Sequence, residues 1–237
     1  METLNMNTLP LKGLRGSISR LFVKVWSEVP QVTIMSEADV TEFQKLKGSV
    51  ISAAGNPTNV RITYTHILMK AIAMALKEHP VVNSVVIDDE VRIMPDVNIC
   101  LVVLREDDIN LGPVIHNVDT RPVTAIAVET NEKVARARDG TFSKEDFAGG
   151  TFALSNIGMF GVSGMVTPLI IQPMSAILLT GPIEKKPVVR NDEVVIRSMM
   201  SCSLTFDHRA MTAAPPSRFL QTLAGILENP AEIDLGL

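Results

Sequence analysis

The chain has 237 residues, of which 46% are hydrophobic and only 4% aromatic, and its formal net charge at pH 7 is −4. This length suits one large domain or two small ones, and the composition predicts a sizeable aliphatic core. The mild charge and the lack of any basic run longer than two residues exclude the clustered Lys and Arg of a nucleic-acid-binding surface. No stretch reaches the roughly 20 unbroken apolar residues that a transmembrane helix requires, so no membrane partner is expected.

The N-terminal residues METLNMNTLPLKGL carry neither the apolar core of a signal peptide nor an Arg- and Ser-rich transit pattern. Cys100 and Cys202 lie in apolar runs typical of strands, and we interpret them as buried thiols rather than as a disulfide. These features predict a soluble protein of a reducing compartment. We find no repeat and no Pro-, Gly- or Ser-rich linker, so we expect a single domain over residues 1–237, with residues 1–9 as an extended N-terminal arm.

Periodicity predicts the elements in chain order. Segments with helical spacing of apolar residues, or with helix start and stop signals, lie at 14–28, 41–48, 65–79, 122–138, 143–146 and 216–227. Segments that alternate as strands lie at 31–40, 81–87, 91–94, 97–104, 109–115, 151–161, 175–183 and in a hairpin over 188–206. Pro30 should stop the first helix and Gly48 the second. Helices and strands mix without a strict βαβ rhythm, which favours an α+β fold over a doubly wound sheet.

Among the four histidines, His66, His79 and His116 are interpreted as structural or solvated. They share no ligand-like spacing with one another or with the cysteines, so we expect no metal site. His208 differs because it follows an alternating apolar strand and precedes the Pro215-Pro216 helix start. An imidazole at a strand exit can act as a general base near neutral pH.

Several segments in a fixed order resemble the catalytic core of the dihydrolipoamide acyltransferases, the E2 components of 2-oxoacid dehydrogenase complexes. The resemblance covers about Pro10 to Pro230, in PLKGLRGSIS, ADVTEFQKLK, THILMKAIAMAL with PVVNS, GGTFALSNIGMFG, SAILLTG and FDHRAMTAAPPSRFLQTLAGILENP. GGTFALSNIGMFG is the most specific of these motifs. The resemblance implies a chloramphenicol-acetyltransferase-like two-layer fold, in which helices flank a mixed sheet.

The resemblance also implies a reaction, in which an acyl group moves between acyl-coenzyme A and a thiol such as dihydrolipoamide. In that family a His of one subunit takes the proton of the attacking thiol, and a Ser of the neighbouring subunit stabilises the oxyanion. His208 and Ser155 of the SNIG motif match these residues and lie 53 positions apart, a spacing that the family also shows. Asn156, Gly158 and Arg209 are candidate substrate-binding residues beside them.

The sequence departs from the family at the residues after the histidine. The family motif is His-x-x-x-Asp-Gly, whereas Thr212 and Ala213 follow His208 here. In relatives the Asp pairs with an Arg of the first helix, and Arg15 holds the matching position. A buried Arg without its counter-charge costs several kcal/mol, so Arg15 must find another acceptor or turn to solvent.

Two more departures from the family lie in the predicted strands. Cys100 stands where relatives often carry Gly, and Gly112 replaces a β-branched residue.

Four apolar residues have two interpretations: Met159, Phe160, Met165 and Met174. They could line a substrate channel, but residues of this type at these spacings are more typical of a core.

The resemblance implies a homotrimer, because the family site forms between subunits, and larger cores such as a 24-mer join trimers through C-terminal residues. Ile233, Leu235 and Leu237 could make such contacts or pack on their own subunit. No lipoyl or peripheral-subunit-binding domain is recognised, so we expect the lipoyl group on another domain or chain. Lipoyl-bearing proteins and 2-oxoacid dehydrogenase components are the expected partners.

Three functions stay open at this point. The first is an active acyltransferase, which the presence of His208 and Ser155 favours. The second is a catalytically impaired core protein with a structural or assembly role, which Thr212 and Ala213 favour. The third is a small-molecule acetyltransferase of the same fold. The expected location is the cytoplasm, or the mitochondrial matrix if the chain is part of a larger eukaryotic protein.

Overall fold

The fold is built around one mixed β-sheet in a computed structural model of the chain, which describes residues 8–52, 60–162 and 164–236. Within these residues six strands form the sheet in the order β1-β10-β9-β8-β4-β7. Their bounds are β1 (Gln31–Asp39), β4 (Ile99–Leu101), β7 (Val114–Ile115), β8 (Phe152–Asn156), β9 (Ala176–Arg190) and β10 (Glu193–Asp207). β8 runs parallel to β4 and to β9, and the other pairs are antiparallel. The predicted α+β fold with a mixed sheet is confirmed.

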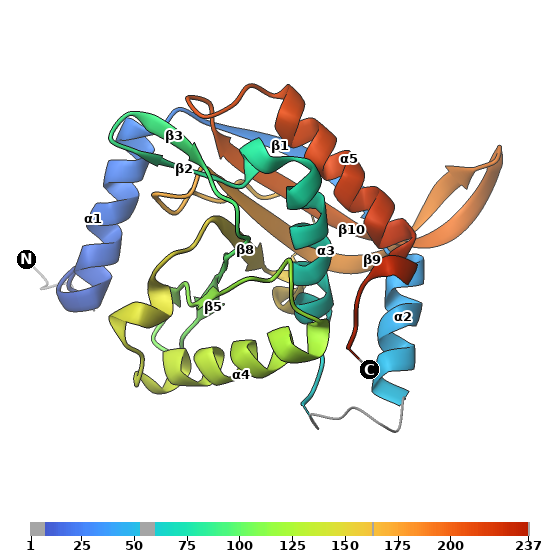
Figure 1. Ribbon diagram of the computed structural model, residues 1–237, viewed down its shortest axis with the longest axis horizontal. Coiled ribbons are helices and arrows are strands. Elements are labelled where there is room, and N and C mark those ends of the chain that lie inside the picture. Colours follow the sequence, from blue (N-terminus) through green and yellow to red (C-terminus); the bar gives the residue numbers. More distant parts are fainter. Residues whose placement is uncertain (1–7, 53–59, 163, 237) are drawn as a thin grey trace, which may run out of the picture.

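Helices form the second layer, and α3 and α5 pack against each other over the sheet (Figure 1). The helices are α1 (Gly13–Glu28), α2 (Thr41–Ser52), α3 (Tyr64–Glu78), α4 (Val123–Asp139) and α5 (Ala214–Glu228). The short elements are β2 (Ser84–Ile87) with β3 (Glu90–Ile93), β5 (Val103–Leu104) with β6 (Asn110–Leu111), and the 3₁₀ turns η1 (Pro80–Val82), η2 (Lys144–Phe147), η3 (Gly158–Phe160) and η4 (Pro230–Glu232). Over the described residues, no helix has both the length and the apolar character needed to cross a membrane.

The central helix α3 is buried on nearly every face. Ile67 and Ile72 are 0% exposed, and fully burying such a side chain contributes about 1.5–3 kcal/mol. Lys70 is buried as well, and its ammonium donates to the carbonyls of Asp119 and Arg121 at 2.7 and 2.8 Å. These bonds replace the water that burial removes, and they tie α3 to the segment before α4.

The first turn of α3 is closed by a capping box. The Thr63 side chain accepts from the main-chain N–H of His66, and the Nδ1 atom of His66 accepts from the N–H of Thr63 at 3.1 Å. Because this Nδ1 atom must be unprotonated to accept, the cap needs a neutral imidazole. Burial acts in the same direction and lowers the pKa of His66 from 6.5 to about 4.

We therefore expect the His66 cap to weaken folding in acid. The folded-state pKa lies below the unfolded one, so the contribution is complete above pH 6.5 and is lost as the pH falls toward about 4, by up to about 3 kcal/mol. His66→Gln keeps a capping-box acceptor and removes the titration. Thermal midpoints at pH 7.5 and pH 4.5 should show a smaller acid loss for His66→Gln than for the wild type. Equal losses in the two proteins would contradict this assignment.

Two predicted helices differ from the structure in extent or type. α2 continues past Gly48 to Ser52, because Gly48 does not adopt the left-handed backbone conformation that would end the helix there. The expected capping box between Ser143 and Asp146 is present, but it opens a 3₁₀ turn rather than an α-helix.

Two predicted strands are shorter than their apolar runs. The run 81–87 begins as the 3₁₀ turn η1, because Pro80 starts a turn at the end of α3, and only Ser84 onward is strand. The run 151–161 leaves the sheet after Asn156, where the glycine-rich sequence turns through η3. Both ends are set by turn residues that an apolar pattern does not detect.

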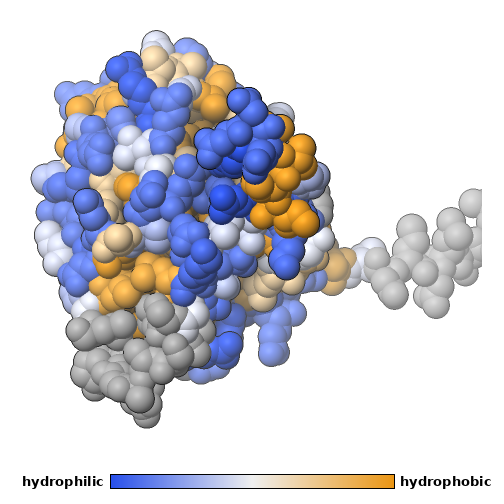
Figure 2. Space-filling view, turned by 90° about the vertical axis from the view of Figure 1, so that its right-hand side faces the viewer, coloured by the Kyte–Doolittle hydropathy of each residue, from blue (hydrophilic) through white to orange (hydrophobic). Residues whose placement is uncertain are grey.

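The outer parts of β9 and β10 form an arm, which we define as residues 184–198 and which extends beyond the helices in Figure 1. β1 accompanies β10 only as far as the pair Asp39–Met199, so farther out the two strands pair with each other alone. One face of the arm is apolar and uncovered, with Val189, Val194 and Ile196 between 66% and 75% exposed. Figure 2 faces this side of the molecule and shows hydrophobic surface next to strongly hydrophilic surface.

The C-terminal tail folds back onto its own chain. Ile233 is 5% exposed and Leu235 packs against the main core. The N–H groups of Val123 and Thr124 donate to the carbonyls of Asp234 and Leu235 at 3.0 and 3.2 Å, which supplies acceptors for the first turn of α4. This agrees with the alternative that Ile233 and Leu235 pack on their own subunit, whereas their contact with another trimer stays a prediction; Leu237 lies outside the described residues.

Candidate active site

His208 is the first residue after β10. Its main chain is hydrogen-bonded, whereas its side chain is exposed. Its N–H donates to the carbonyl of Pro30 at 2.9 Å, which fixes the turn against the segment between α1 and β1. The imidazole lies beside the Phe206 ring, with a centroid distance of 5.8 Å. Among the described residues of this chain, neither ring nitrogen has a hydrogen-bond partner.

Asp207 and Arg209 flank His208 and bind each other. The buried Asp207 carboxylate accepts from the main-chain N–H of Arg209 at 2.9 Å, from its Nε at 3.1 Å and from its Nη2 at 2.7 Å. These hydrogen bonds raise the pKa of Arg209. Arg209 was predicted to bind substrate, whereas its guanidinium is engaged within its own turn. Asp207 was not among the predicted site residues, although a carboxylate two residues before an arginine at a strand end can indicate such a pair.

Ser155 lies near the end of β8 and leaves its hydroxyl free. It pairs in register with Leu179 of β9, and within the described chain its Oγ atom has no hydrogen-bond partner. Asn156, which follows it, uses both ends of its carboxamide locally. Its Oδ1 atom accepts from the N–H of Gly158 at 2.9 Å, and its Nδ2 atom donates to Thr65 at 3.3 Å. Asn156 therefore shapes the turn after Ser155; one N–H and one lone pair of its carboxamide are left over, and substrate binding by this residue stays a prediction.

Gly158 and Gly181 allow this turn to pack closely on β9. A Cβ at Gly158 would lie 3.0 Å from the carbonyl oxygen of Gly181, and a Cβ at Gly181 would lie 2.3 Å from Oγ of Ser201. Ser201 in turn donates to the carbonyl of Gly164 at 3.1 Å. The observed geometry gives Gly158 a packing role, and substrate binding by this residue stays a prediction.

The segment after Ser155 presents apolar side chains to solvent. Met159 is 79% exposed and Phe160 is 53% exposed. Met165 is 44% exposed, whereas Met174 is 5% exposed and belongs to a core cluster with Cys100. The interpretation as core residues is therefore correct for Met174 and wrong for the other three.

Ser155 and His208 of one chain lie at opposite ends of the central strands. Ser155 faces Leu179, which in turn faces Ser203 on β10. Two strand spacings of about 4.8 Å thus separate β8 from β10, and His208 lies five residues, roughly 17 Å, beyond Ser203. The two side chains are roughly 15–20 Å apart on this geometry, too far to act on the same atom.

Arg15 and Thr212 do not pair within this chain. The Arg15 guanidinium donates to the main-chain carbonyl of Asp107. This carbonyl is the acceptor that we expected Arg15 to need in place of the missing carboxylate. Thr212 is exposed, and no hydrogen bond involves its hydroxyl within the described residues. Arg15 also borders a groove of about 320 Å³, together with Leu11, Ile18, Ser19, Phe22, Val23, Asp108, Ile109 and Asn110.

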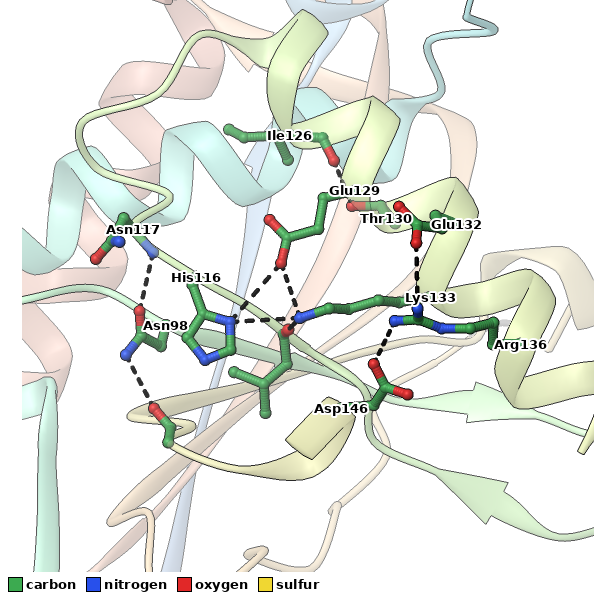
Figure 3. A network of polar contacts seen from close by, with 12 residues as sticks. Asn98, His116, Asn117, Ile126, Glu129, Thr130, Glu132, Lys133, Arg136 and Asp146 are labelled. Atoms are coloured by element: carbon green, nitrogen blue, oxygen red, sulfur yellow. Dashed lines mark hydrogen bonds and ion pairs between the residues drawn. The ribbon is translucent and has the colours of Figure 1, made fainter. Parts of the chain in front are cut away.

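The other histidines have structural partners, as predicted. His79 shares a hydrogen bond of 2.8 Å with Thr222 of α5. His116 lies in the network of Figure 3, where Nδ1 is 3.7 Å from Glu129 and 3.4 Å from Lys133. Burial alone would raise the pKa of Glu129, but hydrogen bonds from Lys133 and Arg121 outweigh it and hold that pKa below its usual value.

Both cysteines are buried free thiols, as predicted. Burial raises the pKa of Cys100 and of Cys202 to about 12, so neither is a thiolate near neutral pH. In the described part of the chain no three His, Cys, Asp or Glu side chains are grouped as a metal site would need.

The fold places the protein in a known structural class. Chloramphenicol acetyltransferase superposes on 92% of this chain and 98% of its own with a TM-score of 0.55 and 12% identity, a likeness that concerns the fold alone. A family model described as 2-oxoacid dehydrogenases acyltransferase (catalytic domain) matches residues 4–235. The chain therefore belongs to that acyltransferase family.

Two curated relatives come from Bacillus subtilis. The acetyltransferase component of the acetoin cleaving system is 31% identical over 227 residues, which are 96% of this chain and 56% of that protein. The lipoamide acyltransferase component of the branched-chain alpha-keto acid dehydrogenase complex is 33% identical over 222 residues, 93% of this chain and 52% of that protein. The chain thus spans about half the length of these relatives.

Two solved structures are similar in sequence as well as in shape. The Azotobacter vinelandii dihydrolipoamide acetyltransferase superposes with a TM-score of 0.89 at 28% identity, over 97% of this chain and 94% of its own. It was investigated for the roles of one serine, one histidine 52 residues later and one asparagine four residues further on in its catalytic mechanism. The cubic core of a pyruvate dehydrogenase multienzyme complex gives the same TM-score, identity and coverage.

Proposed function

We propose that this chain is a coenzyme A-dependent acyltransferase that moves an acyl group between acyl-coenzyme A and a thiol such as dihydrolipoamide. The observation that carries the proposal is the pair of unpartnered polar groups, the His208 imidazole and the Ser155 hydroxyl, in a member of this acyltransferase family. The Azotobacter serine, histidine and asparagine are spaced as Ser155, His208 and Thr212 are, to within one residue. A neutral side chain at the third position therefore has a precedent.

The proposed step needs only a base and an oxyanion donor. His208 takes the proton of the attacking thiol as its sulfur bonds to the thioester carbonyl carbon, and the tetrahedral oxyanion accepts a hydrogen bond from Ser155. Collapse of this intermediate breaks the other carbon–sulfur bond, and the leaving thiolate takes the proton back from His208. A positioned base supplies about 10²–10⁴-fold in rate, and an oxyanion donor about 10²–10³-fold.

We propose a homotrimer as the working unit, with each site formed by His208 of one subunit and Ser155 of the next. The separation of roughly 15–20 Å within a chain supports this arrangement, because only a second copy can bring the two groups together. Uncovered apolar residues occur near both: Met159 and Phe160 after Ser155, and Trp26, 72% exposed, in the last turns of α1 before Pro30. Such a head-to-tail contact closes into a ring when the rotation between neighbours is a whole fraction of a turn, and a three-fold rotation gives the proposed trimer.

The larger assembly and the partners follow from the relatives. The cubic core of the pyruvate dehydrogenase complex supports a 24-mer or other shell for this chain, and the C-terminal tail stays a candidate for the contacts between trimers. We propose acyl-coenzyme A as a substrate, a lipoyl group borne by another domain or chain, and 2-oxoacid dehydrogenase components as partners. The two free thiols fit the cytoplasm or the mitochondrial matrix.

Thr212 supports the alternative, a catalytically impaired core with an assembly role. The active enzyme and the impaired core are distinguished by measuring acyl transfer from acetyl-coenzyme A to dihydrolipoamide with the wild type and with Thr212→Asp. We expect an active wild type and a change of less than about fivefold in the variant, since a pair at such an exposed site supplies at most about 1 kcal/mol. A silent wild type with activity gained in Thr212→Asp would instead establish an impaired core.

A further inference from the structure

The turn that carries His208 is stabilised from within. The carbonyl of Asp207 accepts from the N–H groups of Ala210 and Met211 at 3.0 and 3.3 Å, and its own N–H donates to the carbonyl of Ser175 at 2.8 Å. Asp207 thus connects the turn to the end of the sheet. Its carboxylate is only 3% exposed, so it needs a partner that replaces the lost water.

Arg209 is that partner, and its geometry is specific. The guanidinium meets the carboxylate through Nε and Nη2 at once, a two-point contact that fixes the direction of both side chains. The main-chain N–H of Arg209 donates to the same carboxylate. Because the residues before and after His208 are joined in this way, the Cα–Cβ bond of His208 can take few directions.

We propose that Asp207 and Arg209 act as a positioning pair that holds the His208 turn in its working geometry. This inference rests on the proposed function, and it explains why the chain can lack the carboxylate at position 212. The family motif has an Asp at that position, and the resemblance implies that this Asp, where it is present, pairs with an Arg of the first helix. Here Arg15 is bound to the carbonyl of Asp107. The local pair supplies the support that this distant pair would give.

The proposal is tested with Arg209→Met, Arg209→Lys and the double variant Asp207→Asn/Arg209→Met. Arg209→Met should lower kcat for acyl transfer by about 10²-fold, as expected for a catalytic group displaced by about 1 Å, with little change in KM. Arg209→Lys should recover part of the loss, because Lys keeps the charge but not the two-point contact. The double variant should be no worse than Arg209→Met, because both changes remove one interaction.

A matched control is Arg92→Met. Arg92 likewise donates through Nε and Nη2 to the carboxylate two residues before it, that of Glu90, but on the exposed strand β3 and outside the His208 turn. It should leave kcat and KM unchanged. A rise in KM at constant kcat in Arg209→Met would overturn the proposal, since it would show that Arg209 binds substrate.

Hydrogen exchange separates this inference from the proposed function. In the wild type the amides of His208, Ala210 and Met211 are hydrogen-bonded and should exchange slowly. Arg209→Met should accelerate exchange in the peptide over 207–213 and Arg92→Met should not, whether or not the wild type transfers acyl groups. Unchanged exchange in this peptide would refute the positioning pair, whereas a silent wild type with accelerated exchange would refute the proposed function alone.

Discussion

Two inactive variants, His208→Ala and Ser155→Ala, should regain activity when their chains are co-expressed and assemble together. Each variant alone should lose acyl transfer, by about 10²–10⁴-fold for the base and about 10²–10³-fold for the oxyanion donor. In a mixed trimer some sites combine His208 of a Ser155→Ala chain with Ser155 of a His208→Ala chain. With random mixing of equal amounts in a ring of like contacts, about a quarter of the sites should be intact.

The measurement is acyl transfer by the purified mixed assembly, with a different tag on each chain to prove mixing. The control is His208→Ala co-expressed with the double variant His208→Ala/Ser155→Ala, which contains no intact histidine and must stay inactive. A mixed assembly without recovered activity would place both groups in one chain or remove Ser155 from the site. The distance of roughly 15–20 Å between them within a chain argues against the first of these outcomes.

The sequence predicts the elements well where apolar periodicity is long, as in α3 and the β9–β10 hairpin. It fails where turn chemistry ends an apolar run, as at Pro80, or where a glycine continues a helix, as at Gly48. Apolar periodicity indicates which face of a helix or strand is buried, but it does not indicate the residue at which the helix or strand ends. Boundaries therefore depend on single residues.

For the candidate site, the residue types indicate which chemistry is possible, but they do not indicate whether a side chain is already hydrogen-bonded within the protein. His208 and Ser155 were found because the motifs around them resemble a family, and both have free polar atoms in the structure. Asn156 and Arg209 have residue types equally suited to binding, yet part of their hydrogen-bonding capacity is used within the protein, by Gly158 and Thr65 in one case and by Asp207 in the other. Which polar group stays free is decided by local hydrogen bonds, and these depend on geometry that a sequence does not list.

The departures at Cys100 and Gly112 compensate each other in the folded chain. A Cβ at Gly112 would lie 2.5 Å from Sγ of Cys100, and that sulfur already contacts the carbonyl of Gly112 at 3.3 Å. Cys100 is 3% exposed and packs in a buried cluster with Val114 and Met174, which restricts its movement. Relatives often carry the opposite arrangement, a Gly at the first position and a β-branched residue at the second. The two sites therefore share one volume.

We expect Gly112→Val to destabilise the protein strongly. Adding Cys100→Gly to that variant should restore part of the lost stability. Overpacking costs about 1–3 kcal/mol and sometimes more, which in a domain of this size lowers the thermal midpoint by about 2–4 °C per kcal/mol. Cys100→Gly alone should also destabilise, through a small cavity and a more flexible strand. In the double variant the valine fills the space that the sulfur leaves, so its loss should be clearly smaller than the sum of the single losses.

Gly225→Ala is the matched control, because a Cβ at that exposed position of α5 meets no atom within 4 Å. It should raise the midpoint slightly, since Ala is favoured over Gly in a helix by about 1 kcal/mol. All midpoints must be measured at one protein concentration, because assembly contributes to stability. Additive losses in the double variant would show that β4 and the segment before β7 move apart to admit the valine, and the two departures would then be independent.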